Sequence, residues 1–204
     1  MAITINDYEN VEVFGDFKPL PIGAHICKIV ECGLYTGKSG KTTLRVAIDV
    51  SEGEYKDYFK EIFDKDTNAD KKWSNNACRY LSLEVGKQGQ LKGLLTAVNN
   101  SNSSQVKHEM NEGNLTFEES DLIGKLIGGV FGLEEYINNE GELKTANKLR
   151  QFRSVEELKN VPTPDVIIYG GDRVSYDDYM EKQETKPALA DNPQPLIKDE
   201  DLPF

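Results

Sequence analysis

The chain has 204 residues, of which 38% are hydrophobic and 29% charged, and its formal net charge is −11. This balance is typical of a globular domain with a polar surface and excludes a fully disordered chain. No apolar run approaches the roughly 18 residues of a membrane span, and the start has neither a basic nor an apolar signal region. We therefore expect a soluble cytoplasmic protein with no membrane contact. The three cysteines and two histidines lack zinc spacing, so we expect no metal and no cofactor.

The first predicted elements form a β-hairpin. Residues 22–34 are rich in β-branched side chains, and residues 42–50 (TTLRVAIDV) alternate at period two. The glycines of residues 35–41 (YTGKSGK) predict a tight turn between them. The hairpin should bury one face, formed by Leu44, Val46, Ile48 and Val50, and turn the other way Thr43, Arg45, Ala47 and Asp49.

A third strand and a helical insertion follow in the sequence. Residues 54–63 (EYKDYFKEIF) predict a strand that carries several aromatic side chains. The apolar period then changes to about 3.6 residues, which predicts helices. The two expected helical faces are Trp73, Ala77, Tyr80 and Leu81, and then Leu91, Leu94, Leu95 and Val98. Residues 99–120 are polar and without period, which predicts a long surface loop.

A second hairpin is predicted near the end of the domain. Strand character returns in residues 122–137, and NNEG at residues 138–141 predicts the turn into a returning strand over residues 142–155. Residues 166–171 (VIIYGG) favour an edge strand. Residues 172–204 hold nine acidic and four basic residues, so they account for −5 of the net charge and predict a disordered acidic tail.

These elements predict a mostly β fold. Five or so short antiparallel strands in two hairpin groups, with helices between the third and fourth, are typical of an OB-fold-like small Greek-key barrel with a helical insertion. A small sandwich would give similar signals. We expect one domain over residues 1–171 and a flexible acidic tail over residues 172–204 with a partner-binding tip.

Three segments combine cations with aromatic rings, the pairing that single-stranded nucleic acid requires for its phosphates and bases. The candidates are Tyr35, Lys38, Lys41 and Arg45 in the first hairpin, Tyr58, Lys60, Lys71, Lys72 and Trp73 after it, and Lys148, Arg150 and Phe152, which share a face at period two. Each segment also has a simpler interpretation as a solvated turn or as core. For Trp73 the core interpretation is the stronger one, because its helical phase matches that of Ala77 and Tyr80.

Signals for catalysis are weak. The acid pair Glu118 and Glu119 would point to opposite faces of a strand, so the two carboxylates would not share a metal. Residues 37–43 (GKSGKTT) lack the spacing of a phosphate-binding P-loop and precede a strand where that motif requires a helix. We therefore expect no enzymatic activity.

The chain ends in a short linear motif, DEDLPF, made of Asp199, Glu200, Asp201, Leu202, Pro203 and Phe204. The apolar Leu-Pro-Phe end suits a pocket on a partner, and the acids suit a basic surface around it. The motif closely resembles the C-terminal tip of bacterial and phage single-stranded DNA-binding proteins. That resemblance implies an OB-fold core that coats single-stranded DNA, and a tip that docks replication, recombination and repair proteins.

The body resembles a group of phage replication-module proteins more than the familiar bacterial protein. The resemblance lies in a G-x-Y/H opening, K-x-G-K, E-G-E-Y and L-I-G-K, found here at residues 23–25, 38–41, 52–55 and 122–125. We therefore expect a phage-encoded, sequence-tolerant single-stranded DNA-binding protein that acts in the host cytoplasm, for which a homo-oligomer is compatible with the sequence.

Two other functions stay open. One is a protein-protein adaptor that recruits replication or recombination enzymes without gripping DNA, which the net acidic body favours. The other is a metal-dependent nuclease. The acidic tail also suggests autoinhibition, in which residues 199–204 compete with DNA for the protein's own cationic groove.

Overall fold

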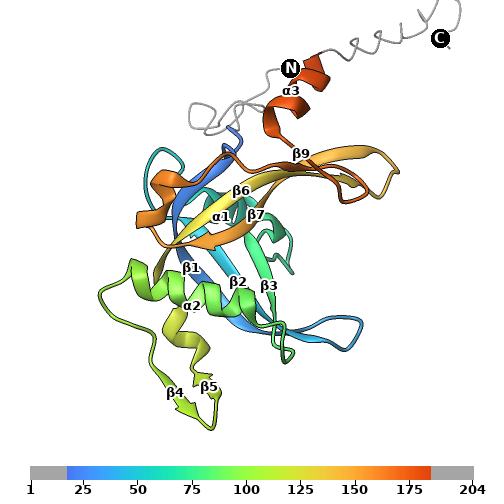
Figure 1. Ribbon diagram of the computed structural model, residues 1–204. Helices are drawn as coiled ribbons and strands as arrows, with labels where there is room; N and C mark the ends of the chain where they lie inside the picture. The colour runs from blue at the N-terminus through green and yellow to red at the C-terminus, as the bar shows by residue number, and fades with distance from the viewer. Residues whose placement is uncertain (1–17, 185–204) are drawn as a thin grey trace, which may run out of the picture.

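The computed structural model describes residues 18–184. One mixed sheet of seven strands dominates it (Figure 1), and the prediction of a mostly β fold is confirmed. The strands of this sheet are β1 (Gly23–Thr36), β2 (Thr42–Val50), β3 (Cys78–Ser82), β6 (Leu126–Ile137), β7 (Leu143–Arg153), β8 (Val166–Ile167) and β9 (Arg173–Val174).

Strand β6 joins the two halves of the sheet. Its first half pairs antiparallel with β1, from Lys28 opposite Leu126 to Gly23 opposite Phe131. Its other edge pairs antiparallel with β7, and its second half meets β8 in a parallel bridge. The strands β1, β2 and β3 form an antiparallel meander on one side of β6. The β6–β7 hairpin therefore docks onto that meander through β1.

The sheet does not close into a barrel among the described residues. Strand β7 passes close to β3, but no ladder joins the two strands. Helix α2 (Gly89–Ser101) lies between them in sequence and packs against β3, β6 and β7. Because no ladder joins β3 and β7, an opening remains between these two strands.

The core is centred on Phe131, which is fully buried in the middle of β6. Its ring stacks on Phe59, with 5.7 Å between the centroids. Gly129 lies next to it, and a Cβ there would come within 2.7 Å of the Ile48 side chain. A larger residue at this position would therefore separate the β6 layer from β2.

The predicted first hairpin is present, but one end of its second face is also covered. Ala47 and Asp49, expected to face away from the core, are fully buried. The chain after β2 folds back over them, so that the Asp49 carboxylate accepts hydrogen bonds from the backbone N–H groups of Val50 and Phe59, each at 2.9 Å. Burial raises the pKa of Asp49, and these two hydrogen bonds only partly oppose that shift.

The third strand predicted over residues 54–63 is wrong, because most of that segment belongs to helix α1 (Tyr58–Lys65). Phe59, Ile62 and Phe63 recur at helical spacing, and all three pack on the core cluster. Aromatic residues are common in strands, which is why the sequence predicts a strand here. The buried side chains of this segment instead recur at a period of about 3.6 residues, as in a helix.

The helix predicted around Trp73 and Tyr80 is also wrong. Trp73 lies in a segment with no regular secondary structure. The short 3₁₀ turn η2 (Asn75–Ala77) follows, and Tyr80 and Leu81 belong to β3. The Trp73 indole N–H donates to the Ile48 carbonyl at 3.1 Å, so its ring anchors the chain over β2. Pairing with β2 outweighs the coincidental helical spacing. The second predicted helical face is confirmed as α2.

The loop predicted over residues 99–120 contains a small hairpin of β4 (His108–Asn111) and β5 (Asn114–Phe117). Its two turn residues, Glu112 and Gly113, both have positive φ, at 49° and 82°. This is the geometry of a tight hairpin turn, which the Asn-Glu-Gly-Asn sequence supports. The 3₁₀ turn η3 (Glu119–Leu122) then leads into β6.

The C-terminal part of the described chain continues the fold beyond Asp172, where we expected the tail to begin. After β7 come the 3₁₀ turn η4 (Glu156–Asn160), β8, β9 and helix α3 (Tyr176–Glu184). Tyr179 in α3 is buried, and its hydroxyl donates to Glu135 of β6 at 3.0 Å. The tip residues 199–204 lie outside the described residues. Among residues 18–184, no helix has both the length and the apolar character to cross a lipid bilayer.

Asp49 gives the fold a specific pH dependence. Because its folded-state pKa is raised, Asp49 favours folding while protonated, and this contribution is lost as the pH rises through the folded pKa. We expect the free energy of unfolding of the wild type, relative to Asp49→Asn, to fall between pH about 4 and neutral pH. Urea unfolding across that range measures it. A difference that is constant or rises with pH would contradict the burial of this carboxylate.

Candidate nucleic-acid interface

Tyr35 and Tyr80 form an exposed aromatic pair on the β1–β2–β3 meander. Tyr35 lies opposite Thr43, and Tyr80 lies opposite Arg45, so all four side chains share one face of the sheet. The two rings meet edge to face with 5.1 Å between centroids, and they are 46% and 40% exposed. Two half-exposed rings on a flat sheet face offer surfaces on which bases can stack.

The turn between β1 and β2 carries the two predicted lysines. Gly40, with φ 77°, closes it by donating its N–H to the Gly37 carbonyl at 2.9 Å. Lys38 and Lys41 are exposed, and Lys41 pairs with Glu84 at 3.2 Å. Solvent screens an exposed pair of this kind, so a phosphate can compete for this lysine.

Arg45 is more restrained than its neighbours. Its guanidinium bonds Glu31 at 2.5 Å and Cys78 Sγ at 3.1 Å, and its side chain is 20% exposed. The predicted contact between Arg45 and a phosphate would therefore have to replace or share Glu31.

The second predicted cluster lies at the far end of β2 from this turn. Eight residue steps separate Thr42 from Val50, which is about 26 Å along a strand. Tyr58 and Lys60 belong to α1, beyond Val50, and Trp73 is buried. The Tyr58 hydroxyl accepts the Leu20 N–H at 3.1 Å, Lys60 pairs with Asp64, and Lys71 lies over the ring of Phe63. Lys71 and Lys72 line an open hollow with Asp66 and Asp70.

The third predicted cluster is divided by a β-bulge in β7. The ladder pairs Phe131 with Leu149 and Val130 with Gln151, so Arg150 is the extra residue. The bulge puts Phe152 on the same side as Leu149, and Phe152 packs on the core cluster. The expectation that Lys148, Arg150 and Phe152 share a face is therefore wrong, because alternation at period two is interrupted at Arg150.

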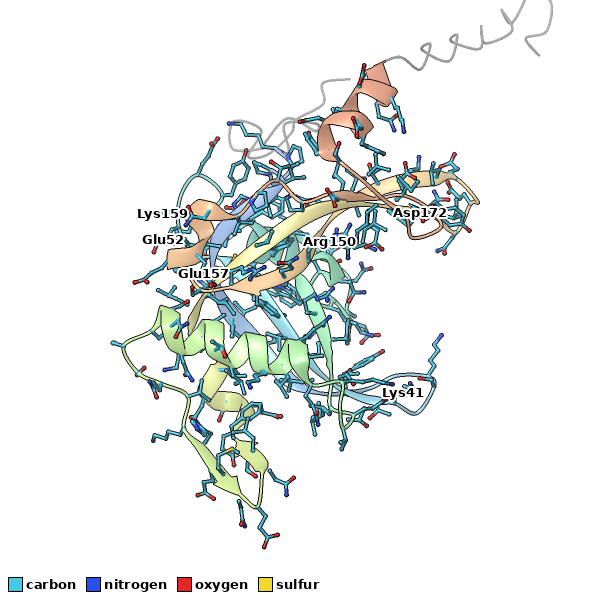
Figure 2. The ribbon with its side chains drawn as sticks, in the orientation of Figure 1. Lys41, Glu52, Arg150, Glu157, Lys159 and Asp172 are labelled. Atoms are coloured by element: carbon cyan, nitrogen blue, oxygen red, sulfur yellow. The ribbon has the colours of Figure 1, made fainter. Side chains whose placement is uncertain are left out.

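Lys148 and Arg150 converge on a single carboxylate. Glu134 of β6 accepts from Lys148 at 2.9 Å and from Arg150 at 3.2 Å. Arg150 also donates to the Leu133 carbonyl, and a Cβ at Gly132 would lie 3.4 Å from its Cγ. The glycine thus allows the arginine side chain to lie close against β6. Figure 2 shows Arg150 beside β6 and β7, and Lys41 at the end of the first hairpin.

The opening between β3 and β7 forms a crevice lined by four arginines, Arg79, Arg150, Arg153 and Arg173, which we call the arginine crevice. It consists of two adjoining hollows of about 330 and 430 Å³ that share Arg79, Gln90, Arg150 and Gln151. Arg79 and Arg173 were not among the predicted site residues. They come from segments far apart in the chain, and no local motif connects them.

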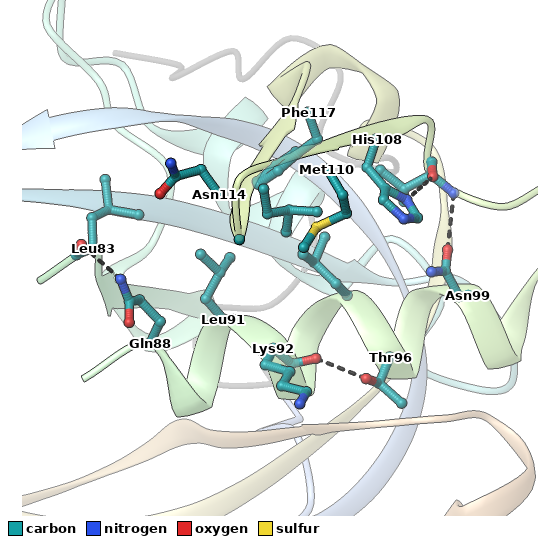
Figure 3. A pocket seen from close by; sticks show the side chains of 14 residues that line it. Leu83, Gln88, Leu91, Lys92, Thr96, Asn99, His108, Met110, Asn114 and Phe117 are labelled. Carbon is teal, nitrogen blue, oxygen red and sulfur yellow. Dashed lines mark hydrogen bonds between the residues drawn. The ribbon is translucent and has the colours of Figure 1, made fainter. Parts of the chain in front are cut away.

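A separate cavity of about 660 Å³ lies between α2 and the β4–β5 hairpin (Figure 3). Leu91 and Leu95 from the helix face Met110, Leu115 and Phe117 from the hairpin side, and Lys92 and His108 contribute polar groups. Met110 is 63% exposed. This lining suits an apolar ligand or protein side chain better than a phosphate backbone.

The cysteines are poor nucleophiles. All three are free, and burial raises the pKa of Cys27 and of Cys32 to about 12. The pKa of Cys78 is raised to about 11, again by burial, although Arg45 opposes the shift. All three thiols therefore stay protonated at neutral pH. Within residues 18–184, no group of three or more metal-ligating side chains is gathered in one place.

No protein-family model matches this sequence, and a search of curated proteins finds no match. Inference about function therefore depends on the chain's own residues and their arrangement.

The bulge in β7 predicts opposite outcomes for two substitutions in that strand. Phe152→Ala removes a ring packed on the core and should lower the free energy of unfolding by about 3 kcal/mol. Lys148→Ala removes one partner of a part-exposed ion pair and should cost less than about 1 kcal/mol. Urea unfolding of both variants measures the difference. Equal costs would show that Phe152 does not lie on the core face.

Proposed function

We propose that this protein binds single-stranded DNA without sequence preference and has an OB-type fold. Three features of the fold support it: the β1–β2–β3 meander, the helix α2 that follows, and the β6–β7 hairpin that returns to β1. An OB-fold has this order of elements, with the helix between its third and fourth strands. The opening between β3 and β7 fits its partly open form.

The observation that carries the proposal is the exposed Tyr35–Tyr80 pair beside the lysine-bearing turn. Sequence-tolerant binding needs ring faces for stacking and cations that can exchange partners. Lys38 and Lys41 supply such cations at the same end of the meander. Both hairpin loops, β1–β2 and β6–β7, extend toward the right side of Figure 1.

The tip residues 199–204 complete the proposal. Their acidic and Leu-Pro-Phe sequence supports capture of replication, recombination or repair proteins, while the folded domain holds the strand. In this account the protein is non-enzymatic, phage-encoded and active in the host cytoplasm.

Loss of the tyrosine pair should weaken DNA binding. Base-aromatic stacking is worth about 1 to 3 kcal/mol per base, so Tyr35→Ala with Tyr80→Ala should lower the affinity for oligo-dT by at least about fivefold. Fluorescence anisotropy at low salt measures the affinity. Tyr169→Ala is the matched control, because Tyr169 is a 63% exposed tyrosine elsewhere on the surface.

Wild-type protein that fails to bind oligo-dT, or binds duplex DNA equally well, would overturn the proposal. If Tyr169→Ala and the double variant lose equal affinity for oligo-dT, the stacking surface does not lie at the Tyr35–Tyr80 pair.

Removal of residues 199–204 separates the two expected activities. Because the tip carries three carboxylates, the truncated protein should bind oligo-dT as well as or better than the full chain. It should also lose the capture of a purified host replication or repair protein that binds the full chain. Anisotropy and pull-down measure the two activities. Weaker DNA binding with intact capture would contradict this role for the tip.

A protein-protein adaptor is the second candidate function. The observation that favours it is the cavity between α2 and the β4–β5 hairpin, whose Met110 and Leu115 are exposed. An adaptor would capture replication proteins through its tip without binding oligo-dT, so the anisotropy experiment distinguishes the two functions.

A further inference from the structure

Arginine is unevenly placed in this protein. The sequence has only five arginines, and four of them line the arginine crevice. They come from β3, β7 and β9, so the fold rather than the local sequence gathers them. Like charges held close together in a partly desolvated cleft repel one another, which is a cost to the fold unless an anion occupies the cleft.

Two of these arginines are oriented by neutral partners. Arg79 donates to the Gln90 side-chain oxygen at 3.2 Å, and Arg153 donates to the Gln151 side-chain oxygen at 3.0 Å. An amide oxygen fixes the direction of a guanidinium but leaves its positive charge uncompensated. The planar guanidinium can then present its remaining N–H groups to a phosphate.

The neighbouring carboxylates do not balance the charge. Glu134 is shared between Lys148 and Arg150 and also opposes the lowering of the pKa of Arg79 by burial. Arg153 is close enough to Glu157 to lower the pKa of that carboxyl, and Asp165 is the acidic side chain that lines the crevice among the described residues. Burial lowers the pKa of Arg150, Glu134 opposes that shift, and the charges of Arg173 and Arg79 lower the pKa further. Arg79, Arg150 and Arg173 are thus close enough for their positive charges to repel one another.

The start of helix α2 adds to the positive potential. Its first residues, Gly89 and Gln90, line the crevice, and its first turn carries no acidic side chain. The N-cap residue Gln88 makes no side-chain capping hydrogen bond. The unsatisfied N–H groups of a helix start attract anions.

We propose that the arginine crevice is a phosphate-binding channel that holds the backbone of the single strand between β3 and β7. That the bound molecule is single-stranded DNA rests on the proposed function. That the crevice binds an anion is inferred from the four arginines alone. Arg79 and Tyr80 are neighbours in β3, and their side chains point to opposite faces of the sheet. Because β3 is an edge strand, a single strand in the channel reaches the tyrosine pair by passing around the edge of β3. The strand would place bases on the tyrosines and consecutive phosphates among the arginines.

The test compares two charge-matched double variants. Arg79→Gln with Arg173→Gln removes two crevice cations, and Lys107→Gln with Lys159→Gln removes two exposed lysines outside the crevice. Each phosphate contact contributes about −0.7 to the slope of log affinity against log salt for single strands. Between about 50 and 200 mM salt, wild-type affinity for oligo-dT should therefore fall about sevenfold more than that of the arginine variant. The lysine control should match the wild type.

A second readout needs no DNA. Pyrophosphate should raise the melting temperature of the wild type and the lysine control, compared with chloride at equal ionic strength, and should do so less for the arginine variant. Because Arg173 is exposed, Arg173→Gln alone provides a variant that keeps the fold and should show about half the change in salt slope.

The outcomes separate the channel from the proposed function. DNA binding with an unchanged salt slope in the arginine variants, and no stabilisation by pyrophosphate, overturns the channel and leaves the proposed function standing. Stabilisation by pyrophosphate that the arginine variants lose, without any binding of oligo-dT, supports an anion site for a free phosphate compound and overturns the proposed function. If the protein neither binds oligo-dT nor is stabilised by pyrophosphate, both the channel and the proposed function are overturned.

Discussion

Pairing along both edges of β6 is the constraint on which the rest of the structure depends. One edge of this strand holds the β1–β2–β3 meander and then β8, and the other edge holds β7. Gly129 and Gly132 make this possible, because a Cβ at either position would meet a neighbouring layer at 3.0 Å or less. Phe131 between them fills the core. Because β6 is paired along both edges, it fixes where β7 lies relative to β3. It therefore also fixes the width of the opening between β3 and β7.

The β7 bulge determines which side chains of β7 line this opening. By inserting Arg150 as an extra residue, it returns Phe152 to the core and leaves Arg150 and Gln151 lining the crevice with Arg79. The cost is the repulsion among the arginines, which Glu134 relieves only in part. In the proposed function, this cost is offset when phosphate groups enter, and the nearby Tyr35–Tyr80 pair receives the bases.

The parts of the fold that sequence could predict are those set by local patterns. Alternation in β2 and the Asn-Asn-Glu-Gly turn between β6 and β7 both act over a few residues, and the apolar period of α2 does so too. The parts that could not be predicted depend on contacts distant in the chain. Trp73 has helical spacing with its neighbours but lies outside any helix, where its indole N–H donates to the Ile48 carbonyl. Phe152 changes face because of the bulge in the pairing of β6 with β7, and Arg79 and Arg173 line one hollow only after folding.

Hydrogen exchange of the full chain, with and without an oligo-dT long enough to cross the domain, tests the central claim most directly. The claim is that a single strand crosses the meander at Tyr35 and Tyr80 and enters the crevice between β3 and β7. The account predicts slower exchange in β3, in the β1–β2 turn and in the first turn of α2, with the β4–β5 hairpin unchanged. Protection confined to the β4–β5 hairpin or to α1 would contradict it, as would binding without any protection in β3.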